Sequence, residues 1–142
     1  MPTKRPTKKS KPAKAAPAFA PRQRKWIAVD FDGVLANYSG YKGKDVLGSP
    51  MPGAARAIGE LKKRGWRVLV YTTRPVTPKL KQWFKRHRIA YDAINTNSMN
   101  PPNTSVKPRV DVWLDDRAVC FTGSWSEALK RVFKFQPWYK KR

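Results

Sequence analysis

The feature that most constrains this chain is a pair of aspartates, Asp30 and Asp32, directly after the apolar run 26–29. The run Trp-Ile-Ala-Val has the length and composition of a buried strand. A carboxylate at the end of such a strand costs on the order of several kcal/mol unless a partner compensates its charge. A divalent cation provides that compensation, and Mg²⁺ held by one or two carboxylates usually also contacts a phosphate. The pair therefore predicts a Mg²⁺ site.

Segments typical of strands and helices alternate along the chain after this pair. Strands are predicted at 26–30, 67–71, 89–94, 110–114 and 118–121, and helices at 52–65, from Thr77-Pro78 through His87, and at 125–135. Thr77 and Ser124 are expected to cap their helices. The alternation predicts an α/β fold, a Rossmann-like three-layer sandwich with a mostly parallel sheet. Ligands of such sheets bind beyond the carboxyl ends of the strands.

Polar residues stand at three of these predicted strand ends: Asp30/Asp32, Thr72/Thr73 and Asp115/Asp116. Phosphoryl transfer needs a nucleophile, a proton donor and cations on the phosphoryl oxygens. Asp30 is placed to attack phosphorus and form an aspartyl phosphate. Asp32 lies two residues on, on the same side of an extended backbone, so it can protonate the leaving oxygen and later activate water.

The remaining candidates would bind the phosphate and the metal. Thr72, or Thr73 if the strand ends later, would donate a hydrogen bond to a phosphoryl oxygen, and Lys107 would place an ammonium on the same oxygens. Asp115 and Asp116 would complete the Mg²⁺ site with Asp30 and Asp32. Other residues near the strand ends have open roles: Arg74 and Arg117 would contact substrate or be structural, and Tyr38 and Tyr41 are candidates for the mouth of the site.

These residues, in this order, resemble the haloacid dehalogenase superfamily. Its motifs match residues 27–34 (a strand followed by Asp-x-Asp-Gly-Val), residues 68–72 (a strand ending in Thr), Lys107, and residues 110–116 (a strand ending in an acidic pair). The resemblance covers about residues 26–124. It implies a Mg²⁺-dependent phosphatase with Asp30 as nucleophile and Asp32 as acid/base. It also implies that the Asp32 backbone carbonyl binds the metal, and it favours Asp115 over Asp116 as the direct ligand.

Many members of that superfamily carry a cap domain over the site, but the spacing here leaves no room for one. The 39 residues between Asp32 and Thr72 are taken up by a loop and a helix. Between Thr72 and Lys107 a helix, a strand and a loop fill the chain. An uncapped cleft excludes water poorly by itself. It therefore suits a large substrate that covers the cleft, or an oligomer whose neighbour does.

The charge is unevenly distributed. The formal net charge is +22, and nine Lys/Arg lie in residues 1–25 with no acidic residue among them. We expect three regions: a disordered basic Lys/Pro/Ala tail at 1–25, the catalytic domain at 26–136, and a basic C-terminal end at 137–142. The basic ends favour nucleic acid as a partner, with a targeting segment as the alternative.

Composition also bears on the compartment. The single cysteine, Cys120, has no internal disulfide partner, and its apolar neighbours predict that it is buried. No stretch has the length of a membrane span or of a secretory signal. We therefore expect a cytoplasmic, nucleoid or nuclear protein that is not secreted.

The sequence leaves two functional hypotheses. The first is a Mg²⁺-dependent phosphomonoester hydrolase that acts through aspartyl phosphate, on a nucleic-acid terminal phosphate, a nucleotide or a sugar phosphate. The alternative is a nucleic-acid-binding protein on the same fold with little or no catalysis.

Overall fold

The computed structural model describes residues 24–96 and 100–141 of the chain. The elements follow one another as β1 (Trp26–Val29), α1 (Ala54–Lys63), β2 (Arg67–Val70), α2 (Pro78–Arg86), β3 (Ala93–Ile94), β4 (Val112–Leu114), α3 (Trp125–Phe133) and the 3₁₀ helix η1 (Trp138–Lys140). The predicted tail lies almost wholly outside the described residues, as do residues 97–99 of the loop before β4.

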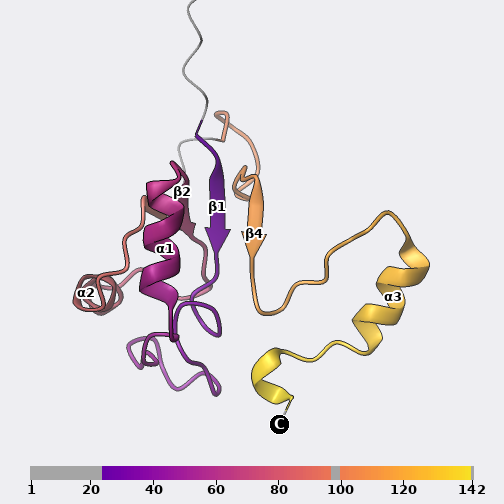
Figure 1. Cartoon of the computed structure of the whole chain (residues 1–142), viewed down its shortest axis with the longest axis horizontal. Coiled ribbons are helices and arrows are strands. Elements are labelled where there is room, and N and C mark those ends of the chain that lie inside the picture. Colours follow the sequence, from indigo (N-terminus) through magenta and orange to yellow (C-terminus); the bar gives the residue numbers. More distant parts are fainter. Residues whose placement is uncertain (1–23, 97–99, 142) are drawn as a thin grey trace, which may run out of the picture.

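The four strands form one parallel sheet in the order β3-β2-β1-β4, which confirms the predicted α/β fold (Figure 1). The central strand β1 pairs on one side with β2, Ile27 opposite Val68, and on the other with β4, Ile27 opposite Val112. All four residues of β1 are buried, as a continuous apolar run predicts for a strand covered on both faces. The carboxyl ends of β1, β2 and β4 therefore lie at the same edge of the sheet.

The main core lies on one face of the sheet. Ile27 and Val29 of β1 belong to the same buried cluster as Ile58 of α1 and Leu80 of α2. Thr77 caps α2 as predicted, because its Oγ1 accepts a hydrogen bond from the Leu80 N–H at 3.2 Å. These two helices and the loop after β1 enclose a densely packed half of the molecule.

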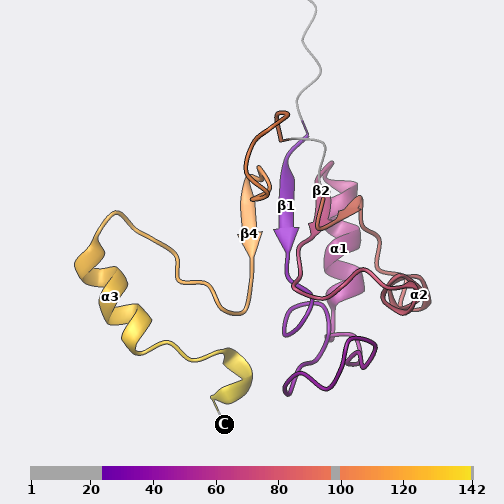
Figure 2. The same ribbon diagram turned by 180° about the vertical axis from the view of Figure 1, so that it is seen from behind.

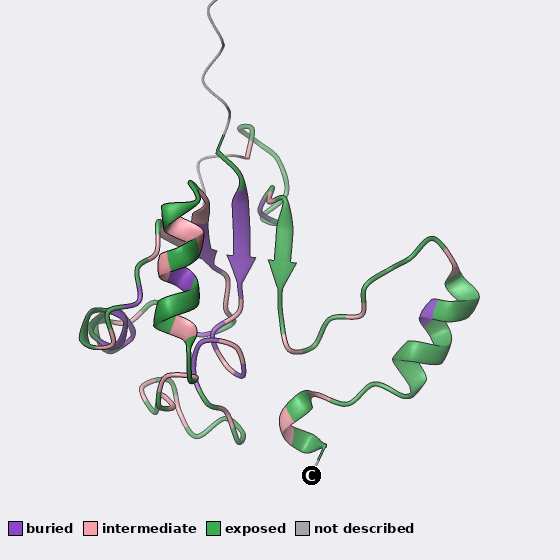
Figure 3. Ribbon diagram, viewed as in Figure 1, coloured by how far each residue is buried: buried purple, intermediate pink, exposed green. Residues whose placement is uncertain are grey.

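The C-terminal part is far more open. In Figures 1 and 2 helix α3 stands apart from the sheet on the β4 side, and in Figure 3 both β4 and α3 are coloured almost entirely as exposed. The side chains of Trp125 and Phe133 are 74% and 80% exposed. The predicted three-layer sandwich requires helices on both faces of the sheet, but α3 does not pack on the sheet in this structure.

Three predictions about this part were wrong. Residues 118–121 form no strand, Cys120 is exposed, and α3 ends at Phe133 instead of residue 135. A short apolar run becomes a strand only where a neighbouring strand pairs with it. In the part of the chain that the structure describes, β4 pairs with β1 and with no further strand. The predicted cap of α3 is confirmed, since the Ser124 side chain accepts from the Glu127 N–H.

The elements around the sheet leave the site uncovered by a separate domain. Among the described residues, α1 is the only helix between β1 and β2, and α2 and β3 are the only elements between β2 and β4. The prediction of a fold without a cap domain is therefore confirmed for the part of the chain that the structure describes. No helix in that part has the length and apolar character needed to cross a membrane.

Candidate active site

Asp30 is the first residue after β1 and lies at the carboxyl edge of the sheet. Its N–H donates to the Leu114 carbonyl at 2.9 Å, and its Oδ1 accepts from the Phe31 N–H at 2.7 Å. Burial above all, helped by the neighbouring Asp116 and Asp115 and opposed by the hydrogen bond from the Phe31 N–H, raises the pKa of Asp30 to about 7. A cation at this place would reverse that effect, because positive charge favours the carboxylate.

Asp115 and Asp116 follow β4 and complete an acidic cluster with Asp30. One carboxylate oxygen from each of the three lies within 4.8 Å of the others. The Asp116 side chain is only 2% exposed, and neither of its oxygens has a hydrogen-bond partner among the described residues. Arg117 Nε lies 3.8 Å from Asp116 Oδ2, beyond hydrogen-bond distance. A buried carboxylate without a donor is costly, so this cluster fits a cation.

Gly33 makes room for this arrangement. A Cβ added there would lie 2.7 Å from Asp116 Oδ2 and 3.1 Å from Tyr139 Cε1, and its φ of +82° is one that residues with side chains rarely adopt. The glycine of the Asp-x-Asp-Gly motif thus lets the turn that follows β1 lie close to Asp115 and Asp116.

The chemistry of the cluster fits Mg²⁺ well. Its three ligands are carboxylate oxygens, the donors that hard divalent cations prefer, and two of the three are partly buried. Asp30, Asp115 and Asp116 are the residues that would hold the ion. The side chain of Asp32, predicted as a fourth acidic ligand, does not belong to the cluster.

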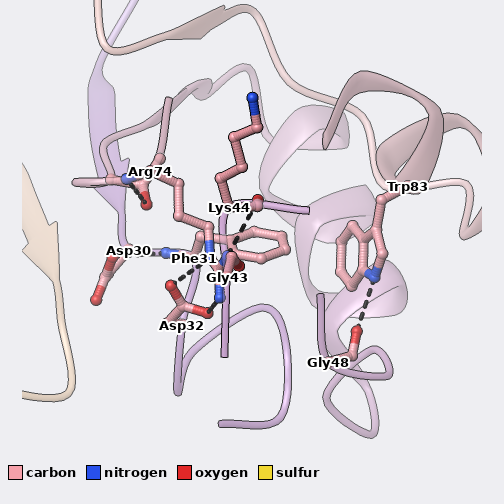
Figure 4. Close-up of polar contacts among 9 residues, drawn as sticks. Asp30, Phe31, Asp32, Gly43, Lys44, Gly48, Arg74 and Trp83 are labelled. Atoms are coloured by element: carbon pink, nitrogen blue, oxygen red, sulfur yellow. Dashed lines mark hydrogen bonds and ion pairs between the residues drawn. The ribbon is translucent and has the colours of Figure 1, made fainter. Parts of the chain in front are cut away.

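Asp32 is instead paired with Arg74, as Figure 4 shows. Arg74 Nε donates to Asp32 Oδ2 at 2.7 Å and Nη2 donates to Oδ1 at 3.0 Å, while Nη1 donates to the Gly43 carbonyl at 3.0 Å. The Arg74 side chain is 3% exposed. A buried bidentate pair fixes both groups in one orientation. Arg74, whose predicted role was either substrate contact or structural, thus holds Asp32 and the loop after β1 in place.

Thr72 and Thr73 line the cavity at the carboxyl edge, as predicted for a phosphate-binding group. Thr72 Oγ1 accepts from the Arg74 N–H at 3.2 Å, which leaves its hydroxyl hydrogen free to donate. The Thr72 N–H donates to Asn95 Oδ1 at 2.8 Å. Asn95, in left-handed conformation after β3, was missed from the sequence; an asparagine at a strand end was the available signal.

Lys107 is not brought to the cavity. Its side chain is exposed on the loop before β4, its Nζ lies 5.9 Å from the centre of the Trp113 ring, and Val106 lines the cavity in its neighbourhood. The structure therefore places the predicted phosphate-binding cation beside the site and not in it.

The cavity itself measures about 590 Å³ and is lined by residues from all the strand ends. Its members are Asp30, Asp32, Tyr38, Tyr71, Thr72, Thr73, Asn95, Val106, Asp115, Asp116 and Arg117. Tyr139, from the predicted basic end, adjoins it: Arg117 Nη2 donates to Tyr139 Oη at 3.0 Å. The sequence favoured Tyr139 only as an aromatic residue of the basic end, for nucleic-acid binding or core packing, and not beside the active site, because its contacts join residues far apart in the chain.

Comparison with known proteins bears mainly on the fold. No protein-family model and no curated protein sequence matches the chain. A structure of a conserved protein from Bacteroides thetaiotaomicron matches with a TM-score of 0.57 and 22% identity, covering 79% of this chain and 92% of that one. That likeness shows a shared fold.

Two weaker likenesses cover less than two thirds of this chain. One is a structure of the Pnkp1/Rnl/Hen1 complex, with a TM-score of 0.44 and 19% identity over 59% of this chain and 32% of that chain. The other is a D,D-heptose 1.7-bisphosphate phosphatase from B. bronchiseptica complexed with magnesium and phosphate, with a TM-score of 0.40 and 24% identity over 57% and 54%.

The fold is thus an α/β domain with a parallel sheet, as the alternation of strands and helices in the sequence predicts, and it is shared with the Bacteroides thetaiotaomicron protein. Its acidic cluster lies at the carboxyl edge of a parallel sheet, where such folds bind their ligands.

Proposed function

We propose that this protein is a Mg²⁺-dependent phosphomonoester hydrolase that acts through an aspartyl-phosphate intermediate. The observation that carries the proposal is the buried carboxylate of Asp116 beside Asp30, which accepts no hydrogen bond among the described residues and lies in a cavity that Thr72 also lines. A structural aspartate would be hydrogen-bonded or exposed. When bound at this cluster, Mg²⁺ would neutralise phosphoryl oxygens and the surrounding carboxylates.

In the first half of the reaction, a carboxylate oxygen of Asp30 attacks phosphorus. A bond from Asp30 to phosphorus forms, the bond from phosphorus to the ester oxygen breaks, and protonated Asp32 gives its proton to that oxygen. The Thr72 hydroxyl donates to a phosphoryl oxygen. Both aspartates line the same cavity, which supports their working on one substrate.

In the second half, water attacks the phosphorus of the aspartyl phosphate. Asp32 accepts the water proton, the bond between Asp30 and phosphorus breaks, and inorganic phosphate leaves. Arg74 is a positioning residue in this scheme, because its bidentate contact fixes the Asp32 carboxylate while leaving further lone pairs for the proton.

The direct test is phosphate release from an aryl phosphate in the presence of Mg²⁺. We expect Asp30→Asn to lower the rate at least about a thousandfold, because the nucleophile is lost. Glu60→Gln is the matched control, since Glu60 is an exposed acid of α1 whose one ion pair among the described residues is with Lys63. Mass spectrometry after an acid quench would locate the added phosphoryl group on Asp30.

Equal background rates in the native protein and Asp30→Asn would contradict the proposal. That result would favour the alternative, a nucleic-acid-binding protein on this fold with little or no catalysis.

A further inference from the structure

Two further cavities adjoin the catalytic one. They measure about 480 and 450 Å³, and Tyr38 lines all three. Arg117 lines both the catalytic cavity and the larger of the two. Because the cavities share these side chains, they are immediate neighbours, and Tyr38 and Arg117 lie where a ligand with its phosphate at Asp30 would extend from the catalytic cavity.

Tyr38 and Tyr139 both line the two further cavities, and Tyr38 lines the catalytic cavity as well. We call this pair of side chains the tyrosine wall. The two ring centres are 5.6 Å apart at an interplanar angle of 81°. The Arg117 guanidinium lies 5.8 Å from the centre of the Tyr38 ring and hydrogen-bonds to Tyr139 Oη. Arg117 is therefore held against both rings, with its side chain still 58% exposed to solvent and to a ligand.

The tyrosine wall is fixed relative to the catalytic residues. Trp138 Nε1 donates to the Gly33 carbonyl at 2.8 Å, which ties the C-terminal segment to the turn that follows Asp30 and Asp32. Arg117 directly follows Asp116. A group bound on the wall would thus sit at a defined distance from the reacting phosphate, as a specificity site requires.

The chemistry of this surface matches a nucleotide. Aromatic rings stack nucleobases, and nearby cations bind the phosphates that join nucleosides. Lys140 lines the 480 Å³ cavity together with Arg117, Tyr38 and Tyr139. The chain as a whole carries 31 basic residues against nine acidic ones, which raises the local concentration of polyanions.

We propose that the tyrosine wall binds the nucleoside part of a phosphorylated nucleoside unit whose terminal phosphate lies at Asp30. This proposal rests on the proposed hydrolase function and names the leaving group. The unit comes either from a free mononucleotide or from the end of a single-stranded oligonucleotide, and both share this chemistry.

The test compares three substrates: a nucleoside monophosphate, a short single-stranded oligonucleotide with a terminal phosphate, and glycerol phosphate, which has no ring. Tyr139→Ala is expected to lower kcat/KM for the better nucleotide substrate about tenfold or more, through KM, since base stacking contributes on this scale. The loss with glycerol phosphate should be at least threefold smaller. Tyr139→Phe keeps the ring and should retain most of the preference.

Substitutions of two lysines distinguish a mononucleotide substrate from an oligonucleotide end. If an oligonucleotide end is the substrate, Lys140→Ala should raise its KM more than Lys141→Ala does, because Lys141 lies outside the cavity lining. If a mononucleotide is the substrate, the two lysine variants should behave alike while the effect of Tyr139→Ala remains. Either pattern supports the tyrosine wall.

An equal loss with all three substrates in Tyr139→Ala, or faster hydrolysis of glycerol phosphate than of either nucleotide, would overturn the inference and leave the hydrolase proposal standing. If no substrate is hydrolysed, the hydrolase proposal fails. In that case, binding of the phosphorylated oligonucleotide and of the mononucleotide, measured by tryptophan fluorescence, still tests whether the tyrosine wall binds a nucleoside. Binding that Tyr139→Ala weakens supports it, and binding that is unchanged overturns it.

Discussion

The two halves of this molecule contribute differently to the same site. Residues 26–94 form a packed unit in which Val68, Leu69 and Val70 of β2 are completely buried. Residues 110–141 are mostly exposed, and even in β4 the exposed fractions of Val112 and Leu114 are 42% and 49%. Yet Asp30 and Thr72 come from the first half, and Asp115, Asp116 and Tyr139 come from the second. Packing therefore fixes one side of the cavity, and polar contacts fix the other.

The comparison teaches where stability and chemistry lie. In the packed half, burial of apolar side chains dominates the free energy of folding. In the open half, the contacts that position residues are few and polar, such as Asp115 Oδ1 accepting from the Arg117 N–H and Trp138 Nε1 donating to the Gly33 carbonyl. Substitutions in the first half should lower stability, and those in the second should mainly alter binding and catalysis.

The largest expected effect on stability is at Phe84. Phe84 is 1% exposed and packs against Phe31, so Phe84→Ala should lower the free energy of unfolding by about 3–5 kcal/mol. Phe133→Ala, the matched change on exposed α3, should alter it by less than about 0.5 kcal/mol. Urea denaturation measures both. Comparable losses would show that α3 is packed in solution and that the two halves do not differ as described.

The next effect concerns Arg74. Arg74→Met leaves Asp32 without its bidentate partner and should cost about 3 kcal/mol of stability, as expected when one member of a buried pair is removed. Phosphate release should fall as well, because Asp32 is no longer held in place. Arg64→Met, at the exposed end of α1, is the control for loss of a positive charge. A stable and fully active Arg74→Met would exclude the positioning role.

A smaller effect of opposite sign is expected at Asp116. Asp116→Asn removes a buried charge that accepts no hydrogen bond among the described residues. In the metal-free protein, in buffer that contains a chelator, it should therefore raise the free energy of unfolding by about 1 kcal/mol. Asp115→Asn should change it little, because Asp115 is exposed. Thermal unfolding of both variants checks this difference. Destabilisation by Asp116→Asn would mean that a protein group stabilises the carboxylate of Asp116 in the metal-free protein.

The smallest effect is a pH dependence within the packed half. Burial would raise the pKa of Asp92, but hydrogen bonds from Lys62 and the Val68 N–H outweigh it and lower the pKa below the ordinary 3.8. When the pKa of a carboxyl group is lower in the folded than in the unfolded protein, its charged form stabilises the folded state. This stabilisation is complete at pH values above the unfolded-state pKa and is lost as the pH falls through the folded-state pKa.

Urea denaturation measured from pH 5 downward should therefore show that the free energy of unfolding decreases once the pH is below about 4. The decrease should be shallower in Asp92→Asn. Glu127→Gln, which removes an exposed acid of α3, should follow the native curve. A native-like decline in Asp92→Asn would assign the pH dependence to other carboxylates.

Much of the fold was predictable because its signals are local. The apolar runs at β1 and β2 and the caps at Thr77 and Ser124 depend on residues adjacent in the chain. The acidic cluster followed from one added rule, that parallel strands end at the same edge. That these aspartates and threonines line one cavity was predicted on this basis.

The rest depends on contacts between distant residues. The pairing of Arg74 with Asp32 spans 42 positions, and that of Trp138 with Gly33 spans 105. Neither pairing has a local pattern, so the role of Arg74 was left open between substrate contact and structure, and residues 137–142 were treated as a basic end. Lys107 was chosen by motif order, which does not fix where a long, exposed side chain points.

The most direct test of the central claim is a calorimetric titration of Mg²⁺ into the metal-free protein and into Asp116→Asn. The account predicts one saturable site in the native protein and binding at least tenfold weaker in the variant, with Asp45→Asn, outside the cluster, behaving as native. Equal binding to native protein and Asp116→Asn, or no binding to either, would contradict it.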